Sequence, residues 1–382
     1  MMNDLFSFID SHLEEYVNFL ENICSFEGMA KDKTEIDKML DYITKFALNK
    51  GFDVERVPFE KCGDFLIIDI NKNEKKGSLF LAHTDTVHKK GTFGYPCVKI
   101  ENGRMQGPGM IDCKGGIAIA LLTMEALKKF GIKEHTRLIL TSDEEVSNVL
   151  GGEKEQQFFK DTVYGFKNAL NCETTKNNEV VVSRKGILRL RIDIKGKGGH
   201  SGIEYFNASS AVLEAAHKIV ALESASKRGA TTYNCSIING GTVANIIPSN
   251  CSFVVDVRVV NLDSMKEAEE FISKVVNTSY VKGTTSTLTK ISSRMPMLKN
   301  DETIELFNTL SKISIKYDLG ELTAVESGGG SDSAYTQHAG VPSLCGLGGC
   351  GDYCHTDKEY IEINSISKRA KLLAAFCVNQ ED

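Results

Sequence analysis

The chain has 382 residues, of which 41% are hydrophobic and 25% charged, and its formal net charge is −6. This composition is that of a folded globular protein, and the length predicts about two domains. The negative charge argues against a nucleic-acid partner, which needs a basic surface, and the absence of any run of ~20 apolar residues argues against a membrane-spanning helix.

The N-terminal segment, residues 1–23, is predicted to form an amphipathic surface helix. Apolar side chains recur at helical spacing from Leu5 to Ile23, with acidic residues between them. The segment lacks the basic start and continuous apolar stretch of a signal peptide. The chain also has eleven cysteines, an odd number, which is more typical of a reducing compartment than of a disulfide framework. We therefore predict a cytoplasmic protein.

Short apolar runs without helical periodicity are predicted to be strands buried on both faces of a sheet. They are residues 65–70, 78–82, 136–141, 168–171 and 341–347. The last four are followed along the chain by His83, Glu144 and Glu145, Glu173, and His355. Because ligands of open α/β sheets bind just outside the carboxyl ends of the strands, we expect these side chains to meet at one edge of an α/β domain.

A glycine-rich loop, residues 107–116, precedes an apolar helical run at residues 117–130. It carries Asp112 at the helix N-terminus, whose partial positive charge stabilises a carboxylate. The glycines resemble part of a dinucleotide-binding fingerprint, but Asp112 stands where the third glycine belongs and would repel a pyrophosphate. We therefore expect Asp112 to hold metal ions rather than a nucleotide.

Between residues 184 and 293 the pattern changes. Strict alternation predicts a half-buried strand at residues 188–195. A helix, two strands, a helix and a strand follow, at residues 208–223, 232–238, 252–260, 263–276 and 285–291. Asp263 or Ser264 is expected to cap the second helix. The order β-α-β-β-α-β is that of a ferredoxin-like module.

The predicted organisation is therefore a catalytic domain with a mixed central sheet flanked by helices, formed by residues 1–183 and 294–382. A ferredoxin-like α+β lid or dimerisation domain, residues 184–293, interrupts it.

The candidate ligands are two histidines and three carboxylates: His83, Asp112, Glu145, Glu173 and His355. This set suits two divalent ions, most simply Zn²⁺, with Co²⁺ or Mn²⁺ as alternatives. One carboxylate must be shared if both ions are to keep an open position. Water held between ions ~3.5–4 Å apart becomes hydroxide near neutral pH.

Neighbouring residues can assist these ligands. Residues two apart face the same way in an extended chain, so Asp85 can orient the imidazole of His83. Of the adjacent Glu144 and Glu145, one can bind a metal while the other takes a proton from the attacking water. A solvated acidic surface is the alternative for this run.

Two further segments suggest substrate contacts. The amides of Gly328, Gly329 and Gly330, before a predicted helix, can hold a substrate carboxylate; a nucleotide phosphate is the alternative, although no Gly-Lys-Ser/Thr accompanies them. Arg258 shares a strand face with Asp256, so it can bind substrate or simply form an ion pair with Asp256.

The cysteines are not predicted to be ligands. Cys345, Cys350 and Cys354 precede His355 at a spacing that fits no zinc or iron–sulfur pattern. Cys113, Cys172 and Cys354 adjoin candidate ligands, but neighbours in an extended chain point in opposite directions.

Together these motifs resemble those of the dizinc aminoacylase and carboxypeptidase superfamily. That superfamily includes acetylornithine deacetylase, succinyl-diaminopimelate desuccinylase, peptidase T and bacterial glutamate carboxypeptidase. The matching segments follow family order over most of the chain: residues 83–87, 107–116, 141–145, 199–202, 240–248, 256–258, 328–332 and 355–357. The last of them is most similar to the glutamate carboxypeptidase branch.

The resemblance implies a role for each metal-site residue. Asp112 would bridge two zinc ions. His83 and Glu173 would complete one site, and Glu145 and His355 the other. Glu144 would be the general base that later protonates the leaving amine, and Asp85 would steady His83.

The resemblance also implies substrate-binding residues. His200 would stabilise the oxyanion, reaching in from the partner subunit of a homodimer formed through the lid domain, and Asn245 would assist it. Arg258 would hold the free carboxylate of the substrate, with the amides of Gly328–Gly330 nearby.

We therefore predict a dizinc metallopeptidase or amidohydrolase that cleaves small peptides or N-acyl amino acids bearing a free carboxylate, in the manner of a carboxypeptidase. The alternative is an N-acyl amino acid deacylase of the acetylornithine deacetylase or desuccinylase type. A non-catalytic relative would have lost a ligand or the base, whereas this chain retains them all.

Overall fold

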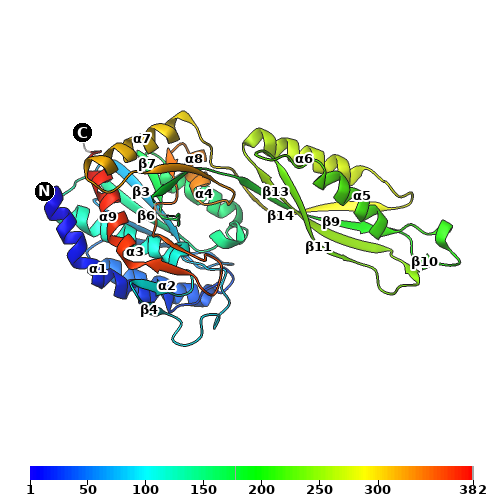
Figure 1. Cartoon of the computed structure of the whole chain (residues 1–382), viewed down its shortest axis with the longest axis horizontal. Coiled ribbons are helices and arrows are strands. Elements are labelled where there is room, and N and C mark those ends of the chain that lie inside the picture. Colours follow the sequence, from blue (N-terminus) through cyan, green and yellow to red (C-terminus); the bar gives the residue numbers. More distant parts are fainter. Residues whose placement is uncertain (177, 381–382) are drawn as a thin grey trace. The chain divides into compact units, whose positions relative to one another are not determined.

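The computed structural model describes residues 1–176 and 178–380 and divides into two compact units (Figure 1). The first unit comprises Met1–Ser183, Leu298–Glu326 and Ser331–Asp382, and the second comprises Arg184–Met297 and Ser327–Gly330. Among the described residues, no helix is both long and apolar enough to cross a membrane.

The first unit is built on a six-stranded mixed sheet in the order β1-β2-β6-β3-β7-β16. Its strands are β1 (Asp53–Val57), β2 (Phe65–Ile70), β3 (Lys76–His83), β6 (His135–Thr141), β7 (Asn168–Asn171) and β16 (Ser343–Leu344). β2 is antiparallel to both β1 and β6, whereas β3 is parallel to β6 and β7, and β16 is parallel to β7. The carboxyl ends of β6, β3, β7 and β16 therefore lie at one edge of the sheet, and the predicted α/β class is confirmed.

Helices pack around this sheet. They are α1 (Met2–Cys24), α2 (Lys33–Asn49), α3 (Gly115–Lys129), α4 (Gly152–Val163), α7 (Asp301–Lys316), α8 (Ser333–His338) and α9 (Ile363–Val378). α3 is buried over almost its whole length because its residues are apolar on every side, and it packs against α1 and α9. α1 buries the apolar stripe that its periodicity predicts, from Leu5 to Ile23.

Smaller sheets complete the first unit. β17 (Gly351–Asp352), β18 (Tyr360–Glu362), β5 (Arg104–Gln106) and β4 (Lys99–Glu101) form one sheet. β8 (Glu179–Arg184) and β15 (Thr323–Ser327) pair in another.

A close backbone approach fixes the start of α3. A Cβ atom added at Gly116 would lie 2.1 Å from the carbonyl oxygen of Cys172, which follows β7. Only glycine allows this approach. It brings the irregular turn Met110–Lys114, which carries Asp112, close to the end of β7.

The second unit is an antiparallel sheet covered by two helices. The sheet has the order β11-β13-β9-β14, formed by β11 (Thr232–Gly240), β13 (Asn250–Val259), β9 (Gly186–Lys195) and β14 (Thr285–Arg294). α5 (Ala211–Glu223) and α6 (Leu262–Asn277) pack on its apolar face. A short pair, β10 (Gly199–His200) and β12 (Ile246–Ile247), lies outside the main sheet.

The helix starts of the second unit differ slightly from expectation. α5 begins at Ala211 because the Ser210 hydroxyl accepts a hydrogen bond from the Leu213 amide. The cap predicted for α6 at Asp263 or Ser264 is wrong. Asn261 is the cap, and its side chain forms a reciprocal capping box with Ser264.

Candidate metal centre

His83 is the last residue of β3, and its ring is almost fully buried. Nδ1 lies 3.1 Å from the carbonyl oxygen of Asp85 and 3.4 Å from its carboxylate. A proton on Nδ1 satisfies these acceptors and leaves Nε2 with a lone pair. Nε2 faces two further acceptors, Asp112 Oδ1 at 3.1 Å and Glu173 Oε1 at 3.7 Å.

Asp112 divides its carboxylate between two histidines. Oδ1 lies near His83, and Oδ2 lies 2.9 Å from Nε2 of His355. His355 Nε2 is in turn 3.5 Å from Glu145 Oε2. The Asp112–Cys113 peptide bond is cis. The side chains predicted as ligands thus converge on Asp112, at the carboxyl edge of the parallel strands.

Asp85 connects this cluster to the two glutamates. Its carboxylate accepts the amide N–H of Glu144 at 3.2 Å and that of Glu145 at 3.0 Å. The two glutamates begin a short helical turn, Glu144–Val146, directly after β6, and the Glu144 side chain is buried. Asp85 therefore orients His83 and also fixes the backbone that carries Glu144.

The charges of the cluster perturb its titration. Burial opposes ionisation of Asp112, yet hydrogen bonds from His355 and His83 hold its pKa well below the usual value. Burial, followed by the charge of Asp112, raises the pKa of Glu145 well above its usual value. Burial alone would lower the pKa of His83, but the acidic groups around it raise this pKa well above the usual value.

The donor set fits two divalent cations. Two ligands of one tetrahedral zinc lie roughly 3.3 Å apart when the donors are nitrogen and oxygen, and the separations among these residues range from 2.9 to 3.7 Å. Glu145 Oε1 is buried without a hydrogen-bond partner among the described residues. Cations at this position would stabilise the facing lone pairs and the surplus carboxylates.

The cysteines depart from expectation. Atoms of Cys113, His83 and Glu173 lie within 4.8 Å of one another, as do those of Cys354, Asp112 and His355. The expectation that cysteines beside ligands point away is wrong for Cys113 and Cys354. The backbone is not regularly extended at these places: ψ is 25° at Cys113, and φ is +65° at His355, which follows Cys354. The Cys172 thiol contacts the carbonyl of Leu170 instead.

Glu359 is a residue that the sequence patterns did not single out. It is fully buried, and its Oε1 accepts the amide N–H groups of Ile111 and Asp112 at 2.9 and 3.1 Å. Its Oε2 lies 2.6 Å from Nε2 of His88. Glu359 therefore holds the turn that presents Asp112. The only sequence signal is its position four residues after His355, which by itself indicates no such contact.

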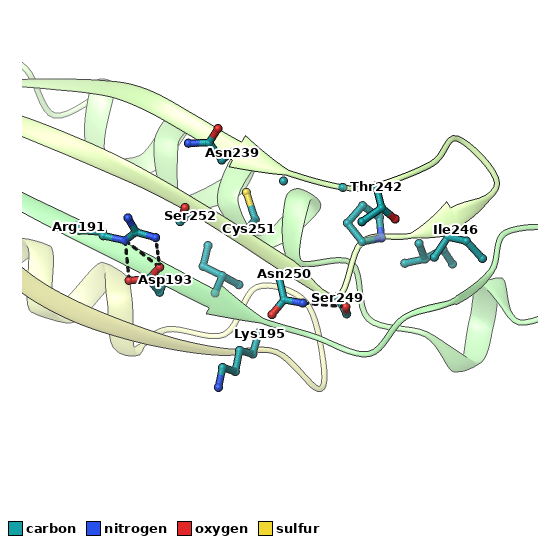
Figure 2. Close-up of a pocket in the computed structure, with 15 residues that line it drawn as sticks. Arg191, Asp193, Lys195, Asn239, Thr242, Ile246, Ser249, Asn250, Cys251 and Ser252 are labelled. Atoms are coloured by element: carbon teal, nitrogen blue, oxygen red, sulfur yellow. Dashed lines mark hydrogen bonds and ion pairs between the residues drawn. The ribbon is translucent and has the colours of Figure 1, made fainter.

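The second unit holds the other predicted residues. His200 on β10 is exposed and pairs with Ile246 on β12, and the Ser201 amide donates to the carbonyl of Asn245. His200 and Asn245 are therefore neighbours. A pocket of about 360 Å³ at this end of the unit is lined by residues that include Arg191, Lys195, Thr242 and Ile246 (Figure 2).

Arg258 forms an ion pair with Asp256, which is the alternative to substrate binding that the sequence left open. Its Nε donates to Asp256 Oδ1 at 2.7 Å, and Arg189 donates to the other oxygen of Asp256 at 2.8 Å. Arg258 also donates to the carbonyl of Gly328 at 3.3 Å. Arg258 and the glycine run Gly328–Gly330 are thus adjacent within the second unit.

Comparisons with known proteins agree with this architecture. The model of peptidase family M20/M25/M40 matches residues 79–379. Carboxypeptidase G2 of a Pseudomonas species is 25% identical, covering 97% of this chain and 91% of that protein. Succinyl-diaminopimelate desuccinylase of Rickettsia akari is 24% identical, covering 92% of this chain and 96% of that protein.

Solved structures share the fold. An M20 family metallo-carboxypeptidase from Sulfolobus solfataricus superposes with a TM-score of 0.79 at 15% identity, covering 95% of this chain and 98% of that one. A tripeptidase from Staphylococcus aureus gives 0.77 at 19% identity, covering 96% and 97%.

Glu359 provides a test of how the Asp112 turn is held. In Glu359, one carboxylate oxygen accepts the two amide N–H groups and the other faces the His88 ring. Glu359→Gln leaves only one of these two oxygens as an acceptor. We expect affinity for divalent ions to fall roughly 10–100-fold, as for other residues that orient ligands. Competition with a chromogenic chelator measures this affinity.

The matched control is Glu362→Gln on the same segment, whose half-exposed side chain contacts Arg104 at 3.9 Å. It should leave affinity unchanged. Equal affinities for the two variants would contradict the role given to Glu359.

Proposed function

Because the chain belongs to peptidase family M20/M25/M40, we propose that this metallohydrolase cleaves an amide bond in small peptides or N-acyl amino acids bearing a free carboxylate. The proposed mode is that of a carboxypeptidase. The observation that carries the proposal is the convergence of His83, His355 and three carboxylates on one edge of the sheet, beside the buried Glu144. Similarity to carboxypeptidase G2 over 97% of the chain supports the carboxypeptidase type.

Two divalent ions are the proposed cofactors, zinc first, with cobalt or manganese as alternatives. Asp112 would bridge them. His83 and Glu173 would hold one ion, and Glu145 and His355 the other. When bound, such ions lower the pKa of water and polarise the amide carbonyl.

Glu144 is the proposed general base. Its amide is held by Asp85, so its carboxylate starts from a fixed backbone position next to Glu145. It would take a proton from the attacking water and deliver it to the nitrogen of the leaving amine as the C–N bond breaks. To accept the proton of the water, the Glu144 carboxylate must be ionised before the water attacks.

Substrate binding is assigned to residues of the second unit. Arg258, with the amides of Gly328–Gly330, would hold the free carboxylate of the substrate, supported by the contact between Arg258 and Gly328. His200 would donate to the developing oxyanion, with its neighbour Asn245 assisting. Because the His200 side chain is exposed, it is free to contact a group that does not belong to the β10–β12 pair.

A homodimer through the second unit is proposed to complete the site. Apolar side chains beside His200 and Asn245 are strongly exposed: Ile203 at 80%, Phe206 at 96% and Val243 at 58%. A second copy of the chain would cover these side chains and bring His200 to the partner's centre. The odd number of cysteines supports a reducing, cytoplasmic location.

A deacylase is the second candidate, favoured by the similarity to a succinyl-diaminopimelate desuccinylase over 92% of the chain. In that case the bond cleaved would join an acyl group to an amino acid rather than two amino acids. The same residues would serve both reactions, so only the groups that bind the substrate side chains distinguish them.

A substrate panel tests the proposal. Dipeptides, tripeptides, N-acetyl and N-succinyl amino acids are supplied with Zn²⁺, Co²⁺ or Mn²⁺, and free amine release is measured. We expect hydrolysis of peptides with a free C-terminal carboxylate, and at least ~100-fold lower kcat/KM for their C-terminal amides, which offer Arg258 no substrate carboxylate.

If only the N-acyl amino acids are hydrolysed, the protein is a deacylase rather than a carboxypeptidase. No hydrolysis with any of the metals would contradict the proposed function.

The role of Glu144 is tested by Glu144→Gln, which keeps the shape but removes the base. We expect kcat to fall by roughly 10²–10⁴-fold or more, while the number of bound metal ions is unchanged. Steady-state kinetics and elemental analysis give the two values. The control Glu153→Gln, on the exposed start of α4, should retain wild-type kcat; a Glu144→Gln enzyme of normal kcat would exclude Glu144 as the base.

Exchange of His200 between subunits is tested by mixing two inactive variants, Glu144→Gln and His200→Ala, through unfolding and refolding. If His200 serves the partner's centre, each mixed dimer has one intact site. Random pairing should then restore about a quarter of wild-type activity, because half of the dimers are mixed. Failure to regain activity while mass spectrometry detects mixed dimers would show that His200 acts within its own chain.

A further inference from the structure

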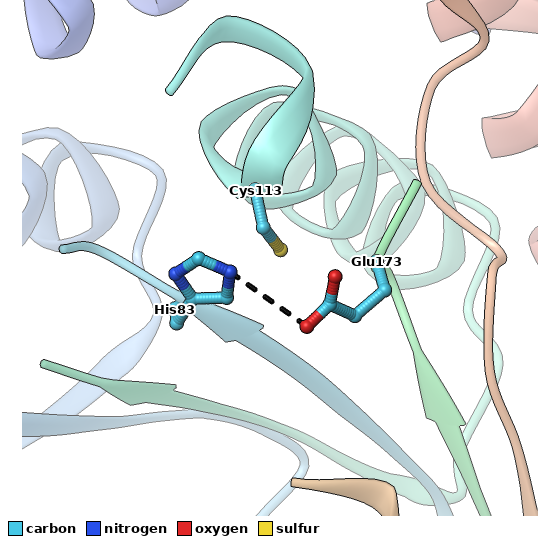
Figure 3. A group of neighbouring side chains, drawn as sticks. All are labelled: His83, Cys113 and Glu173. Carbon is cyan, nitrogen blue, oxygen red and sulfur yellow. Dashed lines mark ion pairs between the residues drawn. The ribbon is translucent and has the colours of Figure 1, made fainter. Parts of the chain in front are cut away.

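The Cys113 thiol lies among the groups proposed to hold one of the two ions. Cys113, His83 and Glu173 are all buried, and their donor atoms lie within 4.8 Å of one another. In Figure 3 the sulfur points toward the space between the His83 imidazole and the Glu173 carboxylate. These three residues come from three segments: the turn before α3, the end of β3 and the residues after β7.

We propose that Cys113 is a thiolate ligand of the ion held by His83 and Glu173. This inference rests on the metal centre of the proposed function and adds a donor of a different kind. The ion would then be bound through nitrogen, oxygen and sulfur. A sulfur donor favours thiophilic ions such as Zn²⁺ and Co²⁺ over Mn²⁺ and Mg²⁺.

The alternative role of a buried thiol is to fill space as a small apolar side chain. Packing alone does not require the sulfur to face an imidazole and a carboxylate. The Cys113 thiol contacts the carbonyl of Cys172, which is its hydrogen-bond acceptor, at 3.4 Å. This is a weak contact that a metal–sulfur bond can replace, with release of the thiol proton to solvent.

Cys354 has a different geometry. Its Sγ lies 2.9 Å from Asp112 Oδ2, whereas a sulfur and an oxygen on one tetrahedral zinc lie about 3.5 Å apart. The thiol of Cys354 donates a hydrogen bond to Asp112 in this structure, and the proposal does not make it a metal ligand. This makes Cys354 a matched control for Cys113.

The two half-sites are consequently unequal. His83, Cys113 and Glu173 are buried, whereas the His355 side chain of the other half-site is 55% exposed. A buried half-site with a sulfur donor is expected to fill first and release its ion slowly. The half-site of Glu145 and His355 is expected to exchange its ion with solvent.

The test uses the full chain loaded with Co²⁺, because thiolate ligation of Co²⁺ produces a charge-transfer absorption band in the near ultraviolet. We expect this band in the wild-type protein and in Cys354→Ser, and its loss in Cys113→Ser. Chelator competition should show at least ~10-fold weaker binding of the tighter Zn²⁺ ion in Cys113→Ser, with no change in Cys354→Ser.

X-ray absorption of the zinc-loaded wild-type protein gives a second measurement that needs no variant, so a Cys113→Ser protein that fails to fold does not prevent a decision. A zinc–sulfur distance of about 2.3 Å is expected. The proposal would be overturned if the metal-loaded protein showed neither the cobalt charge-transfer band nor a zinc–sulfur distance. It would also be overturned if the cobalt band disappeared in Cys354→Ser and persisted in Cys113→Ser. The outcome is independent of the substrate panel, because ligation is measured without turnover.

Discussion

The structure depends on how one buried carboxylate is shared. Asp112 directs one oxygen at His83 and the other at His355, at 3.1 and 2.9 Å. When each imidazole is neutral and Nε2 is unprotonated, these nitrogen and carboxylate oxygen atoms are all acceptors, and further acids surround them. Without positive charge such a cluster would be strongly destabilising. The first unit holds these acceptors close together.

The mixed sheet supplies this constraint. β6, β3 and β7 are neighbours and parallel, so His83, the Glu144–Glu145 pair and Glu173 leave the sheet at the same edge. The turn carrying Asp112 is fixed on one side by Gly116, which permits contact with the backbone of Cys172, and on the other by Glu359. Positions set by buried backbone and by a buried carboxylate are precise, which catalysis by a metal centre requires.

The proposed metal centre is not symmetric. One half is buried and has a thiol beside it, and the other reaches solvent through His355, whose φ of +65° belongs to the loop between β17 and β18. Reactants and exchangeable ions need an open side, whereas a tightly held ion is better kept in a closed one. The same five-residue set can therefore divide retention and access between its halves.

The sequence by itself predicted the α/β class, most strands of the two main sheets, and the recurrence of His and Glu after strands, because apolar runs and their periodicity are local properties. It could not determine the contacts of Cys113, Cys354 or Glu359. Those contacts depend on an irregular turn at Asp112 and a left-handed residue at His355, where the alternation of side chains no longer holds. It also left Arg258 undecided between a substrate and Asp256. The Arg258–Asp256 pair lies within one strand, whereas the contact from Arg189 to the same carboxylate exists only because the folded sheet places Arg189 opposite Asp256. Local pattern specifies which elements form, whereas the direction of a side chain within a tertiary site is set by residues far away in the chain.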